Sequence, residues 1–122
     1  INLFISQDWD GKVSWDKNQI KQVLINLIKN SIEAIYSSGK ISLVISKIDN
    51  QVIIKIIDNG EGIPKENLQK IFNLYFTSKA KGTGIGLSII QRIINEHDGI
   101  ITVESDSKTG TTFTISMPIS NS

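Results

Sequence analysis

Hydrophobic positions recur with two different periods along the chain, and the changes of period divide it into predicted strands and helices. Residues typical of strands in Asn2 to Ser6 and Lys12 to Trp15 flank the turn dipeptide Asp10-Gly11 and predict a short hairpin. Asp16 is a suitable N-cap, and Ser38-Gly39 stops the helical spacing that follows it. A long amphipathic helix is therefore predicted, with an apolar face of Ile20, Leu24, Leu27, Ile28, Ser31 and Ile35.

The centre of the chain predicts two paired strands followed by a loop. Ile41 to Ile48 and Val52 to Ile57 are β-branched runs separated by Asp49-Asn50-Gln51, the pattern of an antiparallel pair. Pro64 suits the first turn of a short helix over roughly 64–71. The segment Asn73 to Gly86 has three glycines and no sustained period, so we expect a mobile loop there.

The last third predicts a helix and a second pair of strands. Leu87 to Asn95 has helical spacing that Asp98-Gly99 ends, and strands are expected at Ile100 to Glu104 and Thr111 to Met117 around the turn Lys108-Thr109-Gly110. This order predicts an α/β (α+β) two-layer sandwich, a mixed, mostly antiparallel sheet covered on one face by about three helices. The 122 residues, 39% of them hydrophobic, fit a single domain over 1–122.

Composition excludes several classes of function. The net charge is +1, with 13 basic and 12 acidic residues spread along the chain, so neither nucleic acid nor direct membrane contact is expected. The absence of cysteine excludes disulfides, thiolate metal sites and cysteine nucleophiles, and it suits a reducing, cytoplasmic location. No apolar run reaches the roughly 18 residues that a membrane span needs. The chain starts at Ile1, and its first residues already have the pattern of a strand, so we expect it to be a fragment of a longer protein. If that protein has a membrane anchor, we expect the anchor to lie outside this chain.

A stripe of amides on the first long helix is a candidate metal site. Gln22, Asn26 and Asn30 are spaced four apart and so share one face of the helix. An amide oxygen is a hard neutral ligand that suits Mg²⁺, which keeps water and phosphate oxygens in its other positions. The alternative is an ordinary solvated polar stripe.

Asp58 ends a strand that is otherwise almost entirely apolar, and a carboxylate there needs a hydrogen-bond partner. The exocyclic amino group of adenine is a suitable donor, whereas guanine presents an oxygen at that position and would be repelled. Gly60 and Gly62 would allow positive φ and close approach of the backbone to a flat ring. The alternative is an ordinary Asp-Asn-Gly turn.

A glycine-rich segment, Gly82-Thr83-Gly84-Ile85-Gly86-Leu87-Ser88, opens the second long helix, with Lys79 and Lys81 just before it. Free N–H groups and the positive end of the helix dipole can receive phosphates, although the spacing matches neither the dinucleotide fingerprint nor the Walker A pattern. A plain flexible hinge is the alternative. His97, the only histidine, is expected to cap or pack the end of this helix, and a solitary histidine argues against zinc.

Together and in this order, these segments resemble the ATP-binding domain of bacterial sensor histidine kinases, within the Bergerat-fold superfamily of gyrase, heat-shock chaperone and mismatch-repair ATPases. The resemblance covers nearly the whole chain. The matching segments are Gln22 to Ala34 (N box), Asp58 to Pro64 (G1 box), Ile71 to Lys79 (F box), Gly82 to Ser88 (G2 box) and Gly110-Thr111-Thr112-Phe113.

The resemblance implies Mg-ATP as cofactor and assigns roles to individual residues. By that resemblance Asn30 holds Mg²⁺, Asn26 supports metal or phosphate, Asp58 binds adenine, and Lys79 belongs with Asn26 and Asn30 to the catalytic group. The residues implied to bind nucleotide are Asn26, Asn30, Glu33, Ala34, Asp58, Gly60, Gly62, Ile63, Lys79, Lys81, Gly82, Thr83, Gly84, Ile85, Gly86, Leu87 and Thr111. The short lid, Thr77 to Gly82, is similar to that of nitrogen-regulator and sporulation-type kinases. Glu33 departs from the pattern, because some relatives carry lysine at that position. Arg92 is a weaker candidate for nucleotide binding.

One position bears on the choice of acceptor. Relatives that activate water or a serine hydroxyl carry a glutamate base four residues before the metal-binding asparagine, where this chain has Asn26, which cannot take a proton. A neutral imidazole has less need of a base. The resemblance therefore implies γ-phosphoryl transfer to a histidine of a dimerisation domain absent here, with a response regulator as later partner and a monomeric isolated domain. The alternatives are an anti-sigma serine kinase and a non-catalytic ATP-sensing interaction module.

Overall fold

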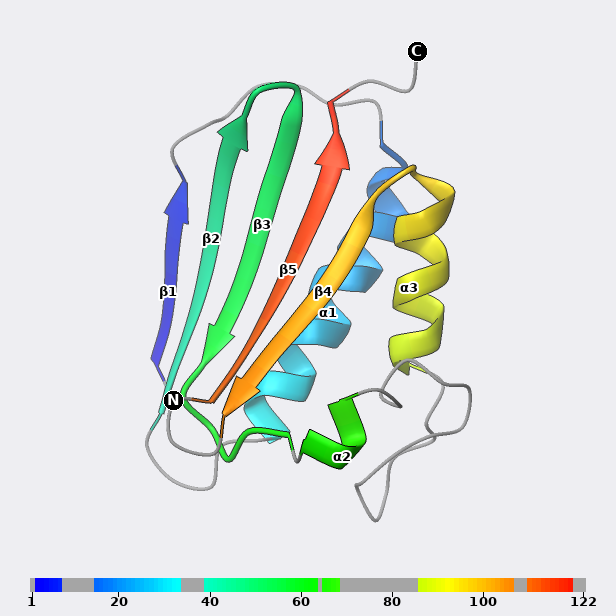
Figure 1. The fold of residues 1–122 in the computed structure, drawn as a ribbon. Helices are drawn as coiled ribbons and strands as arrows, with labels where there is room; N and C mark the ends of the chain where they lie inside the picture. The colour runs from blue at the N-terminus through cyan, green and yellow to red at the C-terminus, as the bar shows by residue number, and fades with distance from the viewer. Residues whose placement is uncertain are drawn as a thin grey trace.

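The computed structural model describes residues 2–7, 15–33, 39–63, 65–68, 86–106 and 110–119. They form five strands and three helices, which Figure 1 labels. In chain order these are β1 (Asn2–Gln7), α1 (Lys17–Glu33), β2 (Lys40–Ile48), β3 (Gln51–Asp58), α2 (Lys65–Leu68), α3 (Gly86–Glu96), β4 (Ile100–Asp106) and β5 (Gly110–Pro118).

The strands form one mixed sheet in the order β1-β2-β3-β5-β4. β1 runs parallel to β2, and every other neighbouring pair is antiparallel. α1 packs on β2 and β3, α3 packs on α1 and β4, and the short α2 contacts β4. In Figure 1, α1 passes behind the sheet with α3 beside it, so the described long helices share one face of the sheet. The predicted α+β two-layer sandwich with a mixed, mostly antiparallel sheet is confirmed.

The predicted hairpin at the start of the chain is described only in its first strand and at Trp15. β1 forms, but its partner in the described structure is β2, with Asn2 opposite Lys40 and Gln7 opposite Ile45. Trp15 lies outside any strand, and residues 12–14 fall outside the described ranges. The Trp15 indole N–H donates to the Pro118 carbonyl oxygen at 2.8 Å. These two residues are 103 positions apart, so no local sequence pattern indicates the contact.

The core lies between the sheet and the two long helices. Buried residues alternate with more accessible, mostly half-buried ones along β3 and β5, because successive side chains of a strand point to opposite faces. α1 buries Val23 and Leu27, one turn apart, and α3 buries Ile90, Ile93 and Ile94. The sheet contributes Ile41, Leu43, Val52, Ile54, Ile56, Ile101, Phe113, Ile115 and Met117.

The predicted element boundaries agree with the structure where it describes them. The N–H of Gln19 donates to Asp16 Oδ1 at 3.0 Å, which confirms Asp16 as the N-cap of α1. The strand pairs β2–β3 and β4–β5 and the helices α2 and α3 confirm the other predicted elements. The predicted mobile loop lies outside the described residues up to Gly86, which begins α3.

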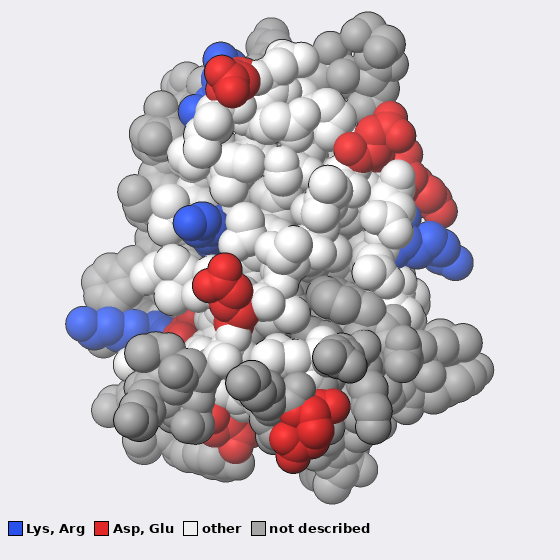
Figure 2. Space-filling view, in the orientation of Figure 1, with Lys and Arg blue, Asp and Glu red and all other residues white. Residues whose placement is uncertain are grey.

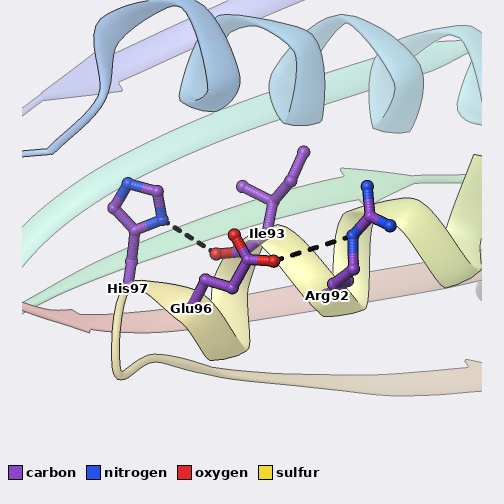
Figure 3. A network of polar contacts seen from close by, with 4 residues as sticks. All are labelled: Arg92, Ile93, Glu96 and His97. Atoms are coloured by element: carbon purple, nitrogen blue, oxygen red, sulfur yellow. Dashed lines mark hydrogen bonds and ion pairs between the residues drawn. The ribbon is translucent and has the colours of Figure 1, made fainter.

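His97 joins the end of α3 to the start of α1. Its side chain is buried, and the backbone N–H of Asp16 donates to Nε2 at 3.1 Å. Because a backbone amide can only donate, Nε2 accepts and the ring proton sits on Nδ1, which bonds the Ile93 carbonyl oxygen at 2.8 Å (Figure 3). The expectation that His97 caps and packs the end of this helix is therefore confirmed.

None of the described helices lies on the opposite face of the sheet. Figure 2 shows that face, where the described Lys, Arg, Asp and Glu residues are scattered and both signs occur. Half-buried Thr112, Thr114 and Ser116 of β5 point to this side, since their neighbours in the alternation are buried. Among the described helices, none has the length and apolar character needed to cross a membrane.

Candidate functional site

Asp58 is a buried carboxylate at the end of β3. The alternation that buries Val52, Ile54 and Ile56 continues to Asp58, so its side chain points to the helix-covered side and is only 3% exposed. Oδ1 accepts two backbone N–H bonds, from Gly60 at 2.9 Å and from Thr111 at 3.3 Å. Both bonds go to Oδ1, so two backbone N–H groups from separate segments hold the carboxylate in place.

Gly110 brings the start of β5 against the end of β3. Its φ is +95°, and a Cβ at this position would lie 2.0 Å from the Asp58 carbonyl oxygen and 2.8 Å from the Asn59 Cα. Glycine fits here because it has no Cβ to collide with these atoms and because it adopts positive φ without a steric penalty. The approach places the N–H of Thr111 at the Asp58 carboxylate.

Ser105 of β4 ties three segments together beside Asp58. It stands opposite Thr111 in the β4–β5 register, and the two hydroxyl oxygens lie 2.8 Å apart. Ser105 Oγ also accepts the N–H of Ile63 at 2.6 Å and contacts the Gly110 carbonyl oxygen at 3.3 Å. Ile63 and Thr111, both predicted site residues, are therefore brought together by a residue that the sequence reasoning missed. The register around the Lys108-Thr109-Gly110 turn was the signal that could have found it.

The segment after Asp58 is shaped by hydrogen bonds as well as by glycine. Gly62 has φ +78°, as expected, but Gly60 does not adopt positive φ. The expectation for Gly60 was wrong because its N–H folds back onto Asp58 Oδ1, a turn that is compatible with ordinary φ. Asn59 Oδ1 accepts the N–H of Lys40 at 2.8 Å, which fixes the same segment to β2.

Asn26 and Asn30 lie on one flank of α1. Both are half-buried, whereas Gln22, one turn earlier, is exposed. Asn30 and Glu33 belong to the last turns of α1, and this end of the helix lies at the same end of the molecule as the end of β3 (Figure 1). Within the described ranges there is no cluster of three or more His, Cys, Asp or Glu side chains for a metal. The amide oxygens of Asn26 and Asn30 are hard neutral groups of the kind that suits Mg²⁺.

The glycine-rich segment is described only where it enters α3. Gly86 is the first residue of α3 and Leu87 is half-buried in the first turn, so a helix N-terminus does follow the glycines as predicted. The predicted site residues that lie outside the described ranges are Ala34, Lys79, Lys81, Gly82, Thr83, Gly84 and Ile85.

Arg92 lies on the exposed side of α3. Its side chain is 71% exposed, and Nε is 3.7 Å from Glu96 Oε1, one turn further along (Figure 3). An exposed pair of this kind contributes little to stability. In this structure Arg92 interacts along its own helix and not with the residues around Asp58.

Comparison with known proteins agrees with this arrangement. Residues 15–121 match the family described as histidine kinase-, DNA gyrase B- and HSP90-like ATPases. Sporulation kinase D of Bacillus subtilis is 44% identical over 110 residues, which are 90% of this chain and 22% of the relative. Sensor histidine kinase ZraS of Escherichia coli is 40% identical over 116 residues, 95% of this chain and 25% of the relative. The chain thus spans about a quarter of the length of these relatives.

Solved structures give the same result. The catalytic domain of histidine kinase ThkA superposes with a TM-score of 0.88 at 38% identity, covering 98% of this chain and 79% of that one. A second ThkA structure, in complex with the response regulator protein TrrA, gives 0.80 at 35% identity and covers 96% of this chain and 34% of that one. With its buried Asp58 and amide-bearing α1 on this fold, the chain belongs to the family of histidine kinase-, DNA gyrase B- and HSP90-like ATPases, and its structural counterparts are the catalytic domains of histidine kinases.

Proposed function

We propose that this domain binds Mg-ATP and that, within a longer kinase, it presents the γ-phosphoryl group to a histidine on a separate dimerisation domain. The observation that carries the proposal is the Asp58 carboxylate, which is 3% exposed and accepts two backbone N–H bonds at Oδ1. A buried carboxylate oxygen needs a donor, and the amino group of adenine supplies one. The residues present therefore fit an adenine nucleotide.

The chain's own residues would hold the nucleotide in distinct ways. Asp58 would select the base, and Gly62 and Ile63 belong to the turn that follows it, where Ser105 holds the N–H of Ile63. The amide oxygens of Asn26 and Asn30 suit Mg²⁺ and phosphate-bound water, and the N-terminus of α3 at Gly86 favours phosphate oxygens. Bound ATP supplies the phosphoryl group: its β–γ bridging P–O bond breaks, a P–N bond forms to the imidazole, and ADP leaves.

The choice of histidine as the phosphoryl acceptor follows from the side chain at position 26. Asn26 is half-buried on the flank of α1 beside Asn30 and has no basic oxygen that could remove a proton from water or serine. An imidazole nitrogen attacks with its own lone pair, so positioning and charge stabilisation suffice. We infer a phosphohistidine product, a response regulator as the next partner, a cytoplasmic site of action and a monomeric isolated domain.

Nucleotide binding can be tested on the domain by titration calorimetry. We expect ADP to bind with dependence on Mg²⁺ and GDP to bind far more weakly. Asn30→Ala should abolish the Mg²⁺ dependence, while Gln22→Ala, which removes an exposed amide from the same flank, should not change it. A folded wild-type domain that binds neither nucleotide would refute the proposal and favour an interaction module.

Transfer can be tested on the longer protein that contains the dimerisation domain. After incubation with ATP labelled in the γ-phosphate, we expect a phosphoprotein whose label is lost in acid and kept in base, as for phosphohistidine. A label that is stable in acid and lost in base would instead identify a serine acceptor and overturn the assignment made from Asn26.

A further inference from the structure

Asn59 and Gly60 form the only Asn-Gly pair of the chain, and Asn59 is exposed. In such a pair the backbone nitrogen of glycine can attack the side-chain carbonyl carbon of asparagine, because glycine has no side chain to shield that nitrogen. The position therefore has both the reacting groups and the access to water that spontaneous deamidation requires.

Hydrogen bonds hold the side chain of Asn59 against the start of β2. Asn59 follows the last pair of the β2–β3 register, Asp58 with Ile41, and so lies beside Lys40. Its backbone N–H donates to the Lys40 carbonyl oxygen at 3.3 Å, and its Oδ1 accepts the Lys40 N–H at 2.8 Å. The side-chain carbonyl thus takes the place of a backbone carbonyl in a pair that extends the ladder.

The attacking nitrogen is held as well. The N–H of Gly60 donates to Asp58 Oδ1 at 2.9 Å, and Gly60 is half-buried. To react, this nitrogen must lose its proton and Asn59 Cγ must swing toward it, so both hydrogen bonds have to open. A nitrogen that loses its proton beside the Asp58 carboxylate also meets like charge. The fold therefore slows a reaction that the sequence permits.

The reaction needs no partner other than water. The Gly60 nitrogen forms a bond to Asn59 Cγ, the Cγ–Nδ2 bond breaks, and ammonia leaves with the amide proton, which gives a cyclic imide. Water then opens the imide at one of its two carbonyl carbons. Attack at Cγ gives aspartate, whereas attack at the backbone carbonyl carbon gives isoaspartate, in which the main chain runs through Cβ and Cγ.

Isoaspartate at position 59 would disturb the neighbouring carboxylate. It adds one methylene, about 1.5 Å of main chain, between Asp58 and Gly60. It also makes the group that bonded Lys40 part of the main chain. The N–H of Gly60 then leaves its place at Oδ1, so Asp58 loses one of its two backbone donors.

We propose that Asn59 is a site of spontaneous deamidation that the folded turn suppresses, and that opening of this turn converts Asn59 to isoaspartate and releases Asp58 from one of its donors. The modification itself does not depend on the proposed nucleotide site. Only its effect on binding rests on the proposed function.

The rate can be followed by peptide mapping with mass spectrometry at mildly alkaline pH, on the folded domain and on the same chain unfolded in guanidinium chloride. We expect deamidation at Asn59 in the unfolded chain, with isoaspartate among the products, and a roughly thirtyfold slower rate in the folded domain, as expected if two hydrogen bonds must open. Asn50, which is exposed and precedes Gln51, is the internal control and should stay unmodified in both. Unfolded Gly60→Ala should react much more slowly than the unfolded wild type, because its methyl group shields the nitrogen.

Two variants test the restraint in the folded state. Asp58→Ala removes the acceptor of the Gly60 N–H and should deamidate at Asn59 roughly fivefold faster than wild type. Glu96→Ala removes an exposed carboxylate from the end of α3 and should react at the wild-type rate. If Asp58→Ala does not fold, the comparison of folded and unfolded wild type decides alone.

An unfolded chain that keeps Asn59 intact would refute the site. A folded domain that reacts as fast as the unfolded chain would refute the restraint and show that the Lys40 N–H activates the carbonyl instead. The isoaspartate form, purified and refolded, should bind ADP roughly tenfold more weakly, the effect of losing one hydrogen bond to a charged group. Wild-type affinity in that form would overturn the effect on Asp58, whereas a wild type that binds no ADP would refute the proposed function and leave the modification site standing.

Discussion

Gly110→Ala should disturb the site more than its small size suggests. The added Cβ would lie 2.0 Å from the Asp58 carbonyl oxygen, whereas such contacts essentially never fall below 3.0 Å, so the start of β5 and the end of β3 must separate by about 1 Å. Alanine would also have to hold φ near +95°, which costs about 1–3 kcal/mol. We expect a total loss of stability of about 3 kcal/mol, and roughly 10 °C in the unfolding temperature.

The displacement should also weaken nucleotide binding. Thr111 follows Gly110 directly and donates to the Asp58 carboxylate, so a 1 Å shift of β5 alters the geometry of the base-selecting group. A misplacement of this size can cost up to about a hundredfold, and we expect at least a tenfold weaker affinity for ADP, measured by calorimetry at a temperature where the variant is folded.

Gly99→Ala separates stability from binding. A Cβ there would lie 2.8 Å from Met117 Cγ and 2.9 Å from the Ser116 carbonyl oxygen, but Gly99 precedes β4 at the end of the sheet away from Asp58. This variant should lose about 1–2 kcal/mol of stability and keep its ADP affinity. The reasoning fails if Gly110→Ala unfolds at the wild-type temperature, or if both variants bind ADP equally well.

Three further substitutions follow from single hydrogen bonds. Asp58→Asn keeps one side-chain oxygen for the two backbone donors but replaces the other oxygen by an NH₂ donor, which would face the amino group of adenine. Calorimetry should therefore show at least a hundredfold loss of ADP affinity. An affinity equal to that of wild type would contradict the role assigned to Asp58. His97→Ala leaves the N–H of Asp16 without its acceptor and should lower the free energy of unfolding in urea by about 2 kcal/mol with ADP affinity unchanged; equal stability would show that this bond contributes nothing. Ser105→Ala releases the N–H of Ile63 and should weaken ADP binding roughly fivefold, and an unaltered titration would argue against a shared network.

Local periodicity was sufficient to predict most of the secondary structure. The burial alternation of β3 and β5 and the N-cap of α1 depend on residues that are close in sequence, so short windows of sequence were enough to predict these elements. The hairpin expected around Asp10-Gly11 lies mostly outside the described residues and stays a prediction. The parallel pairing of β1 with β2 was not predicted, because no local signal encodes a partner 38 positions away.

The site was predictable in its parts but not in its connections. Asp58 was identifiable because it is the polar end of an inward-facing apolar row. Its bond from Thr111 depends on β5 lying next to β3, which is a property of the sheet order and not of either strand. Ser31 was placed on the apolar face of its helix, but only the packed structure shows that its hydroxyl is buried without a hydrogen-bond partner among the described residues.

The connection between Asp58 and Thr111 also bears on when the domain becomes competent during its synthesis. The two residues are 53 positions apart, and the later one belongs to the final strand of the described sheet. β2, β3 and α1 leave the ribosome earlier and can pack together, but the carboxylate then lacks one of its two donors. Pairing across so long a loop is slow compared with hairpin formation, so insertion of β5 between β3 and β4 sets the moment at which the adenine site is complete. A nascent chain that is released before residue 111 would therefore have the helices and most of the sheet but not a finished site for the base.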